Sequence, residues 1–366
     1  MIVIGADTHK QTHTCSAVFA GTGQLAGELT APARKPGFAE ILRWGRALDE
    51  ERIWAIEDCR HVSGSLERFL VAAGERVIRV PPKMMGESRK GERIRGKSDP
   101  IDALAIARAA LKEGPETLPC AHLDERALEV KLLLDHREDL VKARSEDQQR
   151  LRWHLHDLSP ELEIPAGALD RLVWLDRISR KLARSEQSAR VRIARELLCV
   201  IRRRTRRAAE LQREISVLVK AQAPVLVELP GCGALTAAKL LAETAGVQRF
   251  ASDAKLARLA GVAPIPASSG KRQRHRLDRG GNRQLNCALH RIAVTQGRVH
   301  PPARDYLARK QAEGKSRMEA LRCLKRHLAR TVWQALRSAE DRGSNTPLSH
   351  LTNSSNLRPV VGLALT

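Results

Sequence analysis

A long segment in the middle of the chain, residues 123–222, is almost free of glycine, and charged stretches alternate there with leucine. Within it, apolar residues recur at intervals of three and four, which is the spacing of a seam between helices that pack side by side. The seam consists of Ala208, Leu211, Ile215 and Leu218. Pro160 and Pro165 are predicted to mark a hairpin between two long helices. The segment therefore predicts a helical arm, which either mediates self-association as a coiled coil or forms a bundle within one subunit.

This arm divides the chain into parts that differ in pattern. We expect an α/β domain at residues 1–115, the helical arm at 120–222, a mainly helical domain at 223–338 and a disordered tail at 339–366. The tail is rich in Ser, Asn, Pro and Gly, a composition that buries too little apolar surface to fold. The predicted fold class is therefore α/β plus all-α.

The first part alternates between strand and helix patterns. Short β-rich runs with tight connections predict an antiparallel meander, and strand–helix alternation follows, so we expect a mixed sheet with helices on its faces. Strands are predicted at residues 2–7, 15–20, 25–31, 52–57 and 76–80, and helices at 36–48, 62–73 and 103–111. The basic stretch 83–97 predicts an exposed loop.

The charge balance indicates a polyanionic partner. The chain has 64 Lys and Arg against 42 Asp and Glu, which gives a formal net charge of +22. Such a charge favours binding to nucleic acid, the commonest polyanion. The alternative is a solvated basic surface on an arginine-rich protein.

Cysteine spacing and apolar runs exclude several classes of protein. The seven cysteines are scattered without a C-x-x-C pattern, which argues against a disulfide framework and against a zinc ribbon. Asp7, His9 and Lys10 interrupt the N-terminal apolar stretch, so we expect no signal peptide. The chain also lacks an uninterrupted run of about 18 apolar residues, which a membrane span requires. We expect a cytoplasmic protein that associates with the nucleoid and has no membrane partner.

Four acidic residues, Asp7, Glu57, Asp99 and Asp102, stand where their side chains can converge. Asp7 and Glu57 each end a predicted strand. Asp99 and Asp102 lie three apart at the start of a helix, so both project toward one side. Four carboxylates in one cleft suit Mg²⁺ or Mn²⁺, and two ions fit such a set better than one. A pair of ions can clamp the attacking and leaving oxygens of a phosphodiester.

Each acid also has a purely structural interpretation. Asp99 before Pro100 is a good helix N-cap, and Asp102 then completes an arrangement like a capping box. Asp7 and Glu57 could each be a solvated strand end. The order of the four acids along the chain, taken together, favours the metal site.

The same residues resemble motifs of a known family, the insertion sequence 110 family of transposases. The resembling segments are Gly5-Ala6-Asp7-Thr8-His9-Lys10, Ile56-Glu57-Asp58 and Lys97-Ser98-Asp99-Pro100-Ile101-Asp102-Ala103. Asp58-Cys59-Arg60-His61 departs from the small residues that usually follow the family's glutamate. The resemblance implies an RNase H-like (RuvC-like) domain in which Asp7, Glu57, Asp99 and Asp102 form a metal-binding DEDD tetrad.

The second half of the chain resembles the C-terminal transposase domain of the same family. The resembling segments are 229–233, 236–238, 250–252, 259–264, 268–270 and 279–285. In that family a serine just before a glycine is catalytic, which implies Ser269 here, with Ser268 as the less favoured neighbour. The implied step is attack of the serine hydroxyl on a DNA phosphodiester, and that hydroxyl needs a base or a metal to activate it. Without the resemblance, a turn residue in a Ser-Ser-Gly loop is the favoured interpretation of Ser269.

Basic residues follow this serine and can hold phosphates near it. They are Lys271, Arg272, Arg274, Arg276, Arg279 and Arg283. The resemblance implies three kinds of partner: donor and target DNA, a guide (bridge) RNA encoded by the mobile element, and further copies of the chain in a dimer or tetramer.

We therefore predict a DNA transposase or recombinase that cuts and rejoins strands by metal-assisted serine attack under guidance by a bridge RNA. Two alternatives stay open. A structure-selective nuclease, such as a junction resolvase, needs only the tetrad, so Ser269→Ala would leave its cleavage intact. A non-catalytic nucleic-acid-binding protein would keep every activity after Asp7→Asn or Asp102→Asn.

Overall fold

The structure is a computed structural model that describes residues 1–57, 64–80, 98–122, 124–267, 275–276, 278 and 281–344. The predicted loop at 83–97 and most of the predicted tail lie outside these residues. No helix in the described parts of the chain is long and apolar enough to cross a membrane.

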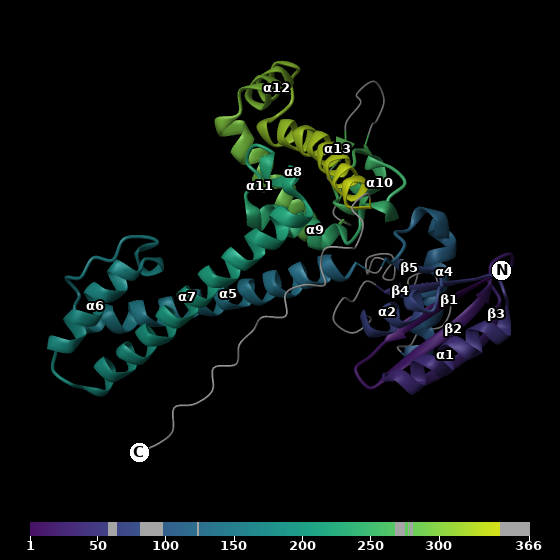
Figure 1. Cartoon of the computed structure of the whole chain (residues 1–366), viewed down its shortest axis with the longest axis horizontal. Helices are drawn as coiled ribbons and strands as arrows, with labels where there is room; N and C mark the ends of the chain where they lie inside the picture. The colour runs from purple at the N-terminus through teal and green to yellow at the C-terminus, as the bar shows by residue number, and fades with distance from the viewer. Residues whose placement is uncertain are drawn as a thin grey trace.

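A five-stranded sheet forms the N-terminal unit (Figure 1). Its strands are β1 (Ile2–Thr8), β2 (Thr12–Phe19), β3 (Leu25–Pro32), β4 (Arg52–Glu57) and β5 (Val77–Val80), in the order β3-β2-β1-β4-β5. The first three strands pair antiparallel, as the meander prediction requires. β4 pairs parallel with β1, and β5 pairs parallel with β4. The sheet is therefore mixed, as the sequence predicts.

Helices cover both faces of this sheet. Side chains alternate along β1, so Ile2, Ile4 and Ala6 pack toward one face and Val3 toward the other. The first face carries α1 (Lys35–Leu48) and α2 (Gly64–Ala72), and the second carries α4 (Asp99–Glu113). This arrangement confirms the predicted fold class, an RNase H-like α/β unit joined to an all-α region.

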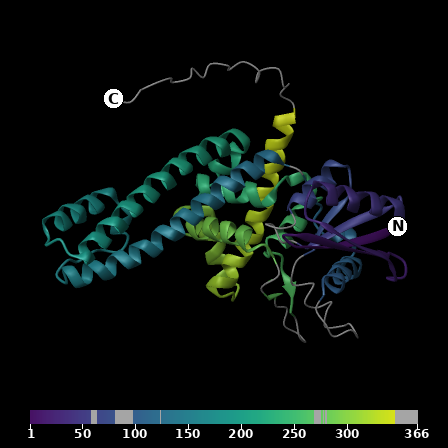
Figure 2. The same cartoon turned by 90° about the horizontal axis from the view of Figure 1, so that it is seen from below.

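Two antiparallel helices of equal length form the arm (Figure 2). α5 (Glu125–Leu158) and α7 (Ala189–Gln222) pack against each other within one chain. The predicted direct hairpin at Pro160 and Pro165 is wrong, because a 3-10 turn (Ala168–Asp170) and a third helix, α6 (Leu172–Arg184), lie between the long helices. α6 packs on α7 and supplies apolar side chains that enclose the far end of the arm.

The seam of α7 differs from the prediction by one residue. Ala208, Leu211 and Ile215 are buried, but the next fully buried position is Val219, and Leu218 is only partly buried. The middle of the arm is polar rather than apolar. There Arg204 pairs with the buried carboxylate of Asp147.

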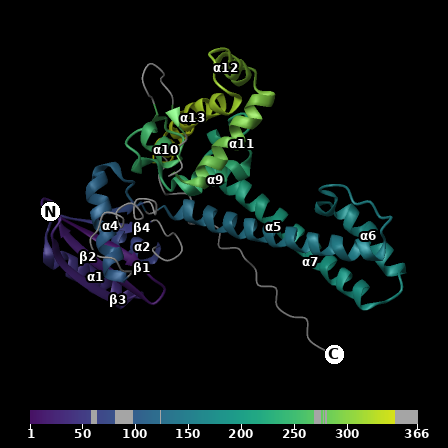
Figure 3. The same ribbon diagram turned by 180° about the vertical axis from the view of Figure 1, so that it is seen from behind.

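The C-terminal unit is mostly helical and continuous with the near end of the arm (Figure 3). Its helices are α8 (Pro224–Glu228), α9 (Ala234–Thr244), α10 (Asp253–Leu259), α11 (Arg283–Val299), α12 (Pro301–Ala312) and α13 (Arg317–Ser344). The ends of α5 and α7 pack on α9 in a single apolar core. A short hairpin of β6 (Ile265–Pro266) and β7 (His275–Arg276) precedes α11. The predicted tail boundary at residue 339 falls inside α13, so the start of that tail is helical.

Candidate functional site

The site begins with Asp7, which lies near the end of the central strand β1. Its side chain shares the sheet face of Val3, which is the face that α4 covers. Gly5, on the same face, lets α4 approach closely, because a Cβ atom built on Gly5 would lie 2.1 Å from the carbonyl oxygen of Ala103. The absence of a side chain at Gly5 thus brings the start of α4 over the end of β1.

The first turn of α4 supplies two of the predicted acids. Asp99 and Asp102 both lie in this turn, with Pro100 between them. The turn is also held from the sheet, because the Ser16 hydroxyl donates to the carbonyl oxygen of Pro100 at 3.3 Å. Ser98, and not Asp99, occupies the N-cap position, and the Ser98 side chain makes no capping hydrogen bond. The structural interpretation of Asp99 as the N-cap is therefore wrong.

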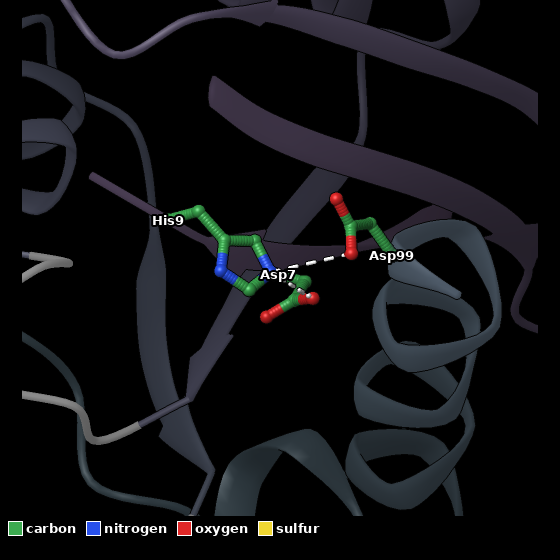
Figure 4. A group of neighbouring side chains, drawn as sticks. All are labelled: Asp7, His9 and Asp99. Carbon is green, nitrogen blue, oxygen red and sulfur yellow. Dashed lines mark hydrogen bonds and ion pairs between the residues drawn. The ribbon is translucent and has the colours of Figure 1, made fainter. Parts of the chain in front are cut away.

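His9 lies between the carboxylates of Asp7 and Asp99 (Figure 4). Its Nε2 atom is 3.1 Å from Oδ2 of Asp7 and 3.4 Å from Oδ1 of Asp99. The three side chains offer ligand atoms that all lie within 4.8 Å of one another. His9 is not among the site residues that the sequence predicts. Its position two residues after Asp7, just beyond the end of β1, is the signal that could have found it.

The electrostatics of Asp7 reflect this crowding. Burial is the largest influence and raises the pKa of the Asp7 carboxyl above its ordinary value, while the hydrogen bond and charge of His9 oppose that rise. The nearby carboxylates of Asp102 and Asp99 raise this pKa further. A cation between these groups would relieve both the desolvation and the repulsion between like charges.

Glu57 and Asp102 lie near this group without joining its closest contacts. Ala6 pairs with Ile56 across β1 and β4, so Asp7 and Glu57 occupy adjacent register positions at the same edge of the sheet. Glu57 shares the face of Ile53 and Ala55, which is the α4 face, and it is half-buried. Asp102 is only 7% exposed and acts electrostatically on Asp7. The structure thus brings Asp7, Asp99 and His9 into one close group and leaves Glu57 and Asp102 beside it.

The donor set fits a divalent ion. Carboxylate oxygens are the ligands that Mg²⁺ and Mn²⁺ prefer, and an imidazole nitrogen is compatible with Mn²⁺. Asp99 is half-exposed, with 51% of its side chain accessible, so an ion and a substrate oxygen could reach the group from solvent.

The predicted serine region lies mostly outside the described residues. The predicted residues outside the described parts of the chain are Ser268, Ser269, Lys271, Arg272, Arg274 and Arg279. Of the predicted phosphate-binding residues, Arg276 lies on β7 and Arg283 begins α11, and both are exposed.

Gly261 and Gly281, which lie before β6 and after β7, pack closely through their backbones. A Cβ atom built on Gly281 would lie 2.1 Å from the backbone nitrogen of Gly261. Asn282 donates from its side chain to the buried carboxylate of Glu243 at 2.8 Å, and it also caps α11. The sequence analysis did not single out Glu243, which nothing in its local pattern distinguishes from a helix-surface acid.

Three relatives of the chain are proteins of insertion elements. It is 26% identical to an uncharacterized 44.8 kDa protein of insertion element IS116 from Streptomyces clavuligerus, over 92% of this chain and 94% of that protein. It is 25% identical to an uncharacterized 42 kDa protein of insertion element IS900 from Mycobacterium paratuberculosis, over 91% and 95% of the two chains. An uncharacterized 43.6 kDa protein of insertion element IS110 from Streptomyces coelicolor is 29% identical over 69% of this chain and 73% of its own length.

Two family profiles match in the order that the fold displays. Residues 4–160 match the DEDD transposases of IS110 type, described as "Transposase". Residues 223–308 match the family described as "Transposase IS116/IS110/IS902 family". The two matches cover roughly two thirds of the chain between them, and the protein belongs to the insertion sequence 110 family of transposases.

Proposed function

We propose that this transposase cuts and rejoins DNA strands at a metal site formed by Asp7, Glu57, Asp99 and Asp102. One observation carries the proposal: carboxylates from a strand end and from a helix start share one small volume in a chain of net charge +22. A cluster of acids on such a basic protein is expected where a divalent ion meets a polyanion.

The residues of the chain have distinct roles in this proposal. Asp7 and Asp99 would hold one Mg²⁺ or Mn²⁺ ion, because their oxygens already lie close together. Glu57 and Asp102, beside them, would complete the ligands for a second ion. When bound, the two ions would stabilise negative charge on the attacking and leaving oxygens of a phosphodiester. His9 holds the two aspartates together and can accept or donate a proton beside them.

The proposed nucleophile is Ser269, with Ser268 as the less favoured candidate. As its Oγ–P bond forms, a P–O bond of the strand breaks, the serine proton passes to a base and the leaving oxygen gains a proton. Arg276 and Arg283, together with Lys271, Arg272, Arg274 and Arg279, hold phosphates near that serine. Reversal of the step, with a new strand end attacking the phosphoserine, rejoins the DNA.

Three parts of the chain have separate roles in this proposal. We propose that residues 1–115 hold the ions, that 120–222 mediate assembly into a dimer or tetramer, and that 223–338 carry the nucleophile. The partners are donor and target DNA and a guide (bridge) RNA, and such substrates place the protein at the nucleoid. The relatives' origin in insertion elements supports a DNA substrate that is the element itself.

The test is trapping of a covalent protein–DNA adduct with DNA that carries the ends of the element. The wild-type protein should form the adduct only with Mg²⁺ or Mn²⁺. Asp7→Asn and Ser269→Ala should abolish it, whereas Ser268→Ala should retain it. Cleavage that survives Ser269→Ala without an adduct would favour a junction-resolving nuclease, and activity untouched by Asp7→Asn would favour a non-catalytic binding protein.

A further inference from the structure

A cavity lies in the C-terminal unit, apart from the acidic group of the N-terminal unit. It has a volume of about 830 Å³ and lies between α12, α13 and the hairpin of β6 and β7. His275 and Arg276 of β7 line it. Pockets of about 300–1,000 Å³ take ligands of the size of a nucleotide.

The lining of this cavity is basic. Six lysines and arginines face three acids there. The basic residues are Arg276, Lys310, Lys315, Arg322, Lys325 and Arg326. Three of them are paired with acids: Lys310 with Glu313, Arg322 with Glu319, and Arg326 with Asp253. Within the described chain, no ion pair joins Arg276 or Lys325 to a carboxylate, and Lys315 acts on Glu313 only through its charge.

Lys325 is the most unusual of these three. It is only 6% exposed, and its ammonium donates to a neutral acceptor, Oδ1 of Asn286, at 2.5 Å. Burial lowers the pKa of this lysine, and the charge of Arg322 lowers it further. An ammonium group has three N–H donors, and a buried cation without an anion is unfavourable. A phosphate in the cavity would supply the missing negative charge.

Tyr306 gives the same cavity an aromatic surface. It is the only tyrosine of the chain, and it is partly buried on α12. Its ring packs edge-on against His327, with 5.1 Å between the ring centroids. The Arg309 guanidinium and the Lys310 ammonium lie over this ring, 5.4 Å and 5.7 Å from its centre. Aromatic rings and arginine side chains are the usual platforms on which proteins stack unpaired bases.

We propose that this cavity binds one unstacked nucleotide of a single-stranded nucleic acid, with its base against Tyr306 and its phosphate on Lys325. The inference deepens the proposed function, on which it rests for the nature of the partner. Both donor DNA opened at a cut site and a guide RNA contain such nucleotides, and the shared chemistry is a base with its adjoining phosphodiester.

The test uses photo-cross-linking of the full-length protein. Short single-stranded oligonucleotides that carry one 5-iodouracil are irradiated with the protein, in a DNA arm and an RNA arm. The cross-link should map by mass spectrometry to the peptide that contains Tyr306, in one arm or in both, and the productive arm identifies the source of the nucleotide. An unlabelled duplex should compete poorly.

Variants separate stacking of a base on Tyr306 from electrostatic attraction between the basic protein and the phosphates. Tyr306→Ala should weaken binding of the oligonucleotide about tenfold, the loss expected for one stacked base, whereas Tyr306→Phe should bind as wild type. Lys325→Gln should reduce the slope of log affinity against log salt by about 0.7, the value for one phosphate contact on a single strand. Lys220→Gln removes an equal charge from an exposed position on α7 and should leave the cross-link at Tyr306 unchanged.

Two results would overturn the proposal. One is mapping of the cross-link outside the cavity in both arms. The other is wild-type affinity of Tyr306→Ala, when its thermal unfolding shows that it is folded. The pair Tyr306→Ala and Tyr306→Phe keeps the test decisive if Lys325→Gln fails to fold. Asp7→Asn should cross-link like wild type, so failure of the metal-site proposal and failure of this one are distinguishable.

Discussion

Gly5→Ala is the substitution that most directly tests how the fold builds the acidic site. The new Cβ atom would lie 2.1 Å from the Ala103 carbonyl oxygen and 2.6 Å from the Ala107 nitrogen, both backbone atoms of α4. The shorter distance is about 1.3 Å below the 3.4 Å at which ordinary contact begins. Neither atom can rotate away, so α4 must move outward by about that amount, carrying Asp99 and Asp102 away from Asp7.

Two measurable losses follow from this movement. Overpacking of a core costs about 1–3 kcal/mol, so the free energy of unfolding should fall by that amount in urea titrations. A displacement of about 1 Å at reacting groups can lower a rate about 100-fold, so Mg²⁺-dependent strand cleavage should fall by roughly two orders of magnitude. Mn²⁺ affinity, measured by electron paramagnetic resonance, should weaken in parallel.

Two matched glycine variants serve as controls. On the opposite face, a Cβ atom on Gly45 would lie 2.5 Å from the Trp54 ring, so Gly45→Ala should destabilise the sheet without moving α4. A Cβ atom on Gly21 would enter open space, so Gly21→Ala should change neither the free energy of unfolding nor the Mn²⁺ affinity. The reasoning is refuted if Gly5→Ala is folded and binds Mn²⁺ as the wild type does, or if Gly45→Ala weakens Mn²⁺ binding as much as Gly5→Ala.

Three further predictions follow from single contacts. Burial raises the pKa of Asp7, so the folded state binds this proton more tightly than the unfolded state and stability falls as pH rises above the ordinary value of 3.8. In metal-free calorimetry Asp7→Asn should therefore melt above wild type by a margin that grows with pH and shrinks on adding Mg²⁺; a margin independent of pH contradicts this. Glu243→Gln should lower the free energy of unfolding by about 1–3 kcal/mol in urea, because Lys131 and Asn282 lose a buried charged acceptor, whereas unchanged stability would show that the carboxylate is dispensable. Arg204→Ala should lower the thermal stability of the arm because it leaves the buried Asp147 with only the exposed Arg150, while Arg203→Ala on the exposed side of α7 should not; equal effects would argue against that pairing.

Much of the N-terminal unit could be predicted because local pattern and tertiary contact agree there. β4 begins at Arg52 and ends at Glu57 as predicted, because the short apolar run between these two charged residues fits only one position of a buried strand. The approach of Asp99 to Asp7 also follows from the order of strands and helices. His9 was missed although it lies two residues after Asp7, because a histidine just beyond the end of a strand looks like a solvated polar residue until the fold brings it between two carboxylates.

The arm shows why the remainder could not be predicted. The intervals of three and four on α7 fit a seam ending at Leu218 or at Val219, and the choice depends on where α9 packs. The sequence did not predict α6, the helix between α5 and α7, because Pro160 and Pro165 also fit a simple turn between two helices. Asp147 is buried in a polar stretch only because Arg204, 57 residues away, lies beside it. Such positions depend on partners distant in the chain, which local spacing does not encode.

The two candidate sites have opposite imbalances of charge, and this links them. At the N-terminal site, acidic groups crowd around one imidazole, and burial, followed by repulsion from Asp102 and Asp99, disfavours the ionised state of Asp7. In the C-terminal cavity, a buried ammonium has only a neutral amide as its described partner. Neither imbalance helps the isolated chain to fold, since each leaves charge partly desolvated and uncompensated. A nucleic acid that arrives with divalent ions removes both, because the ions neutralise the carboxylates and a phosphate neutralises Lys325. Stability that the free protein lacks at these two places thus becomes binding energy for the complex.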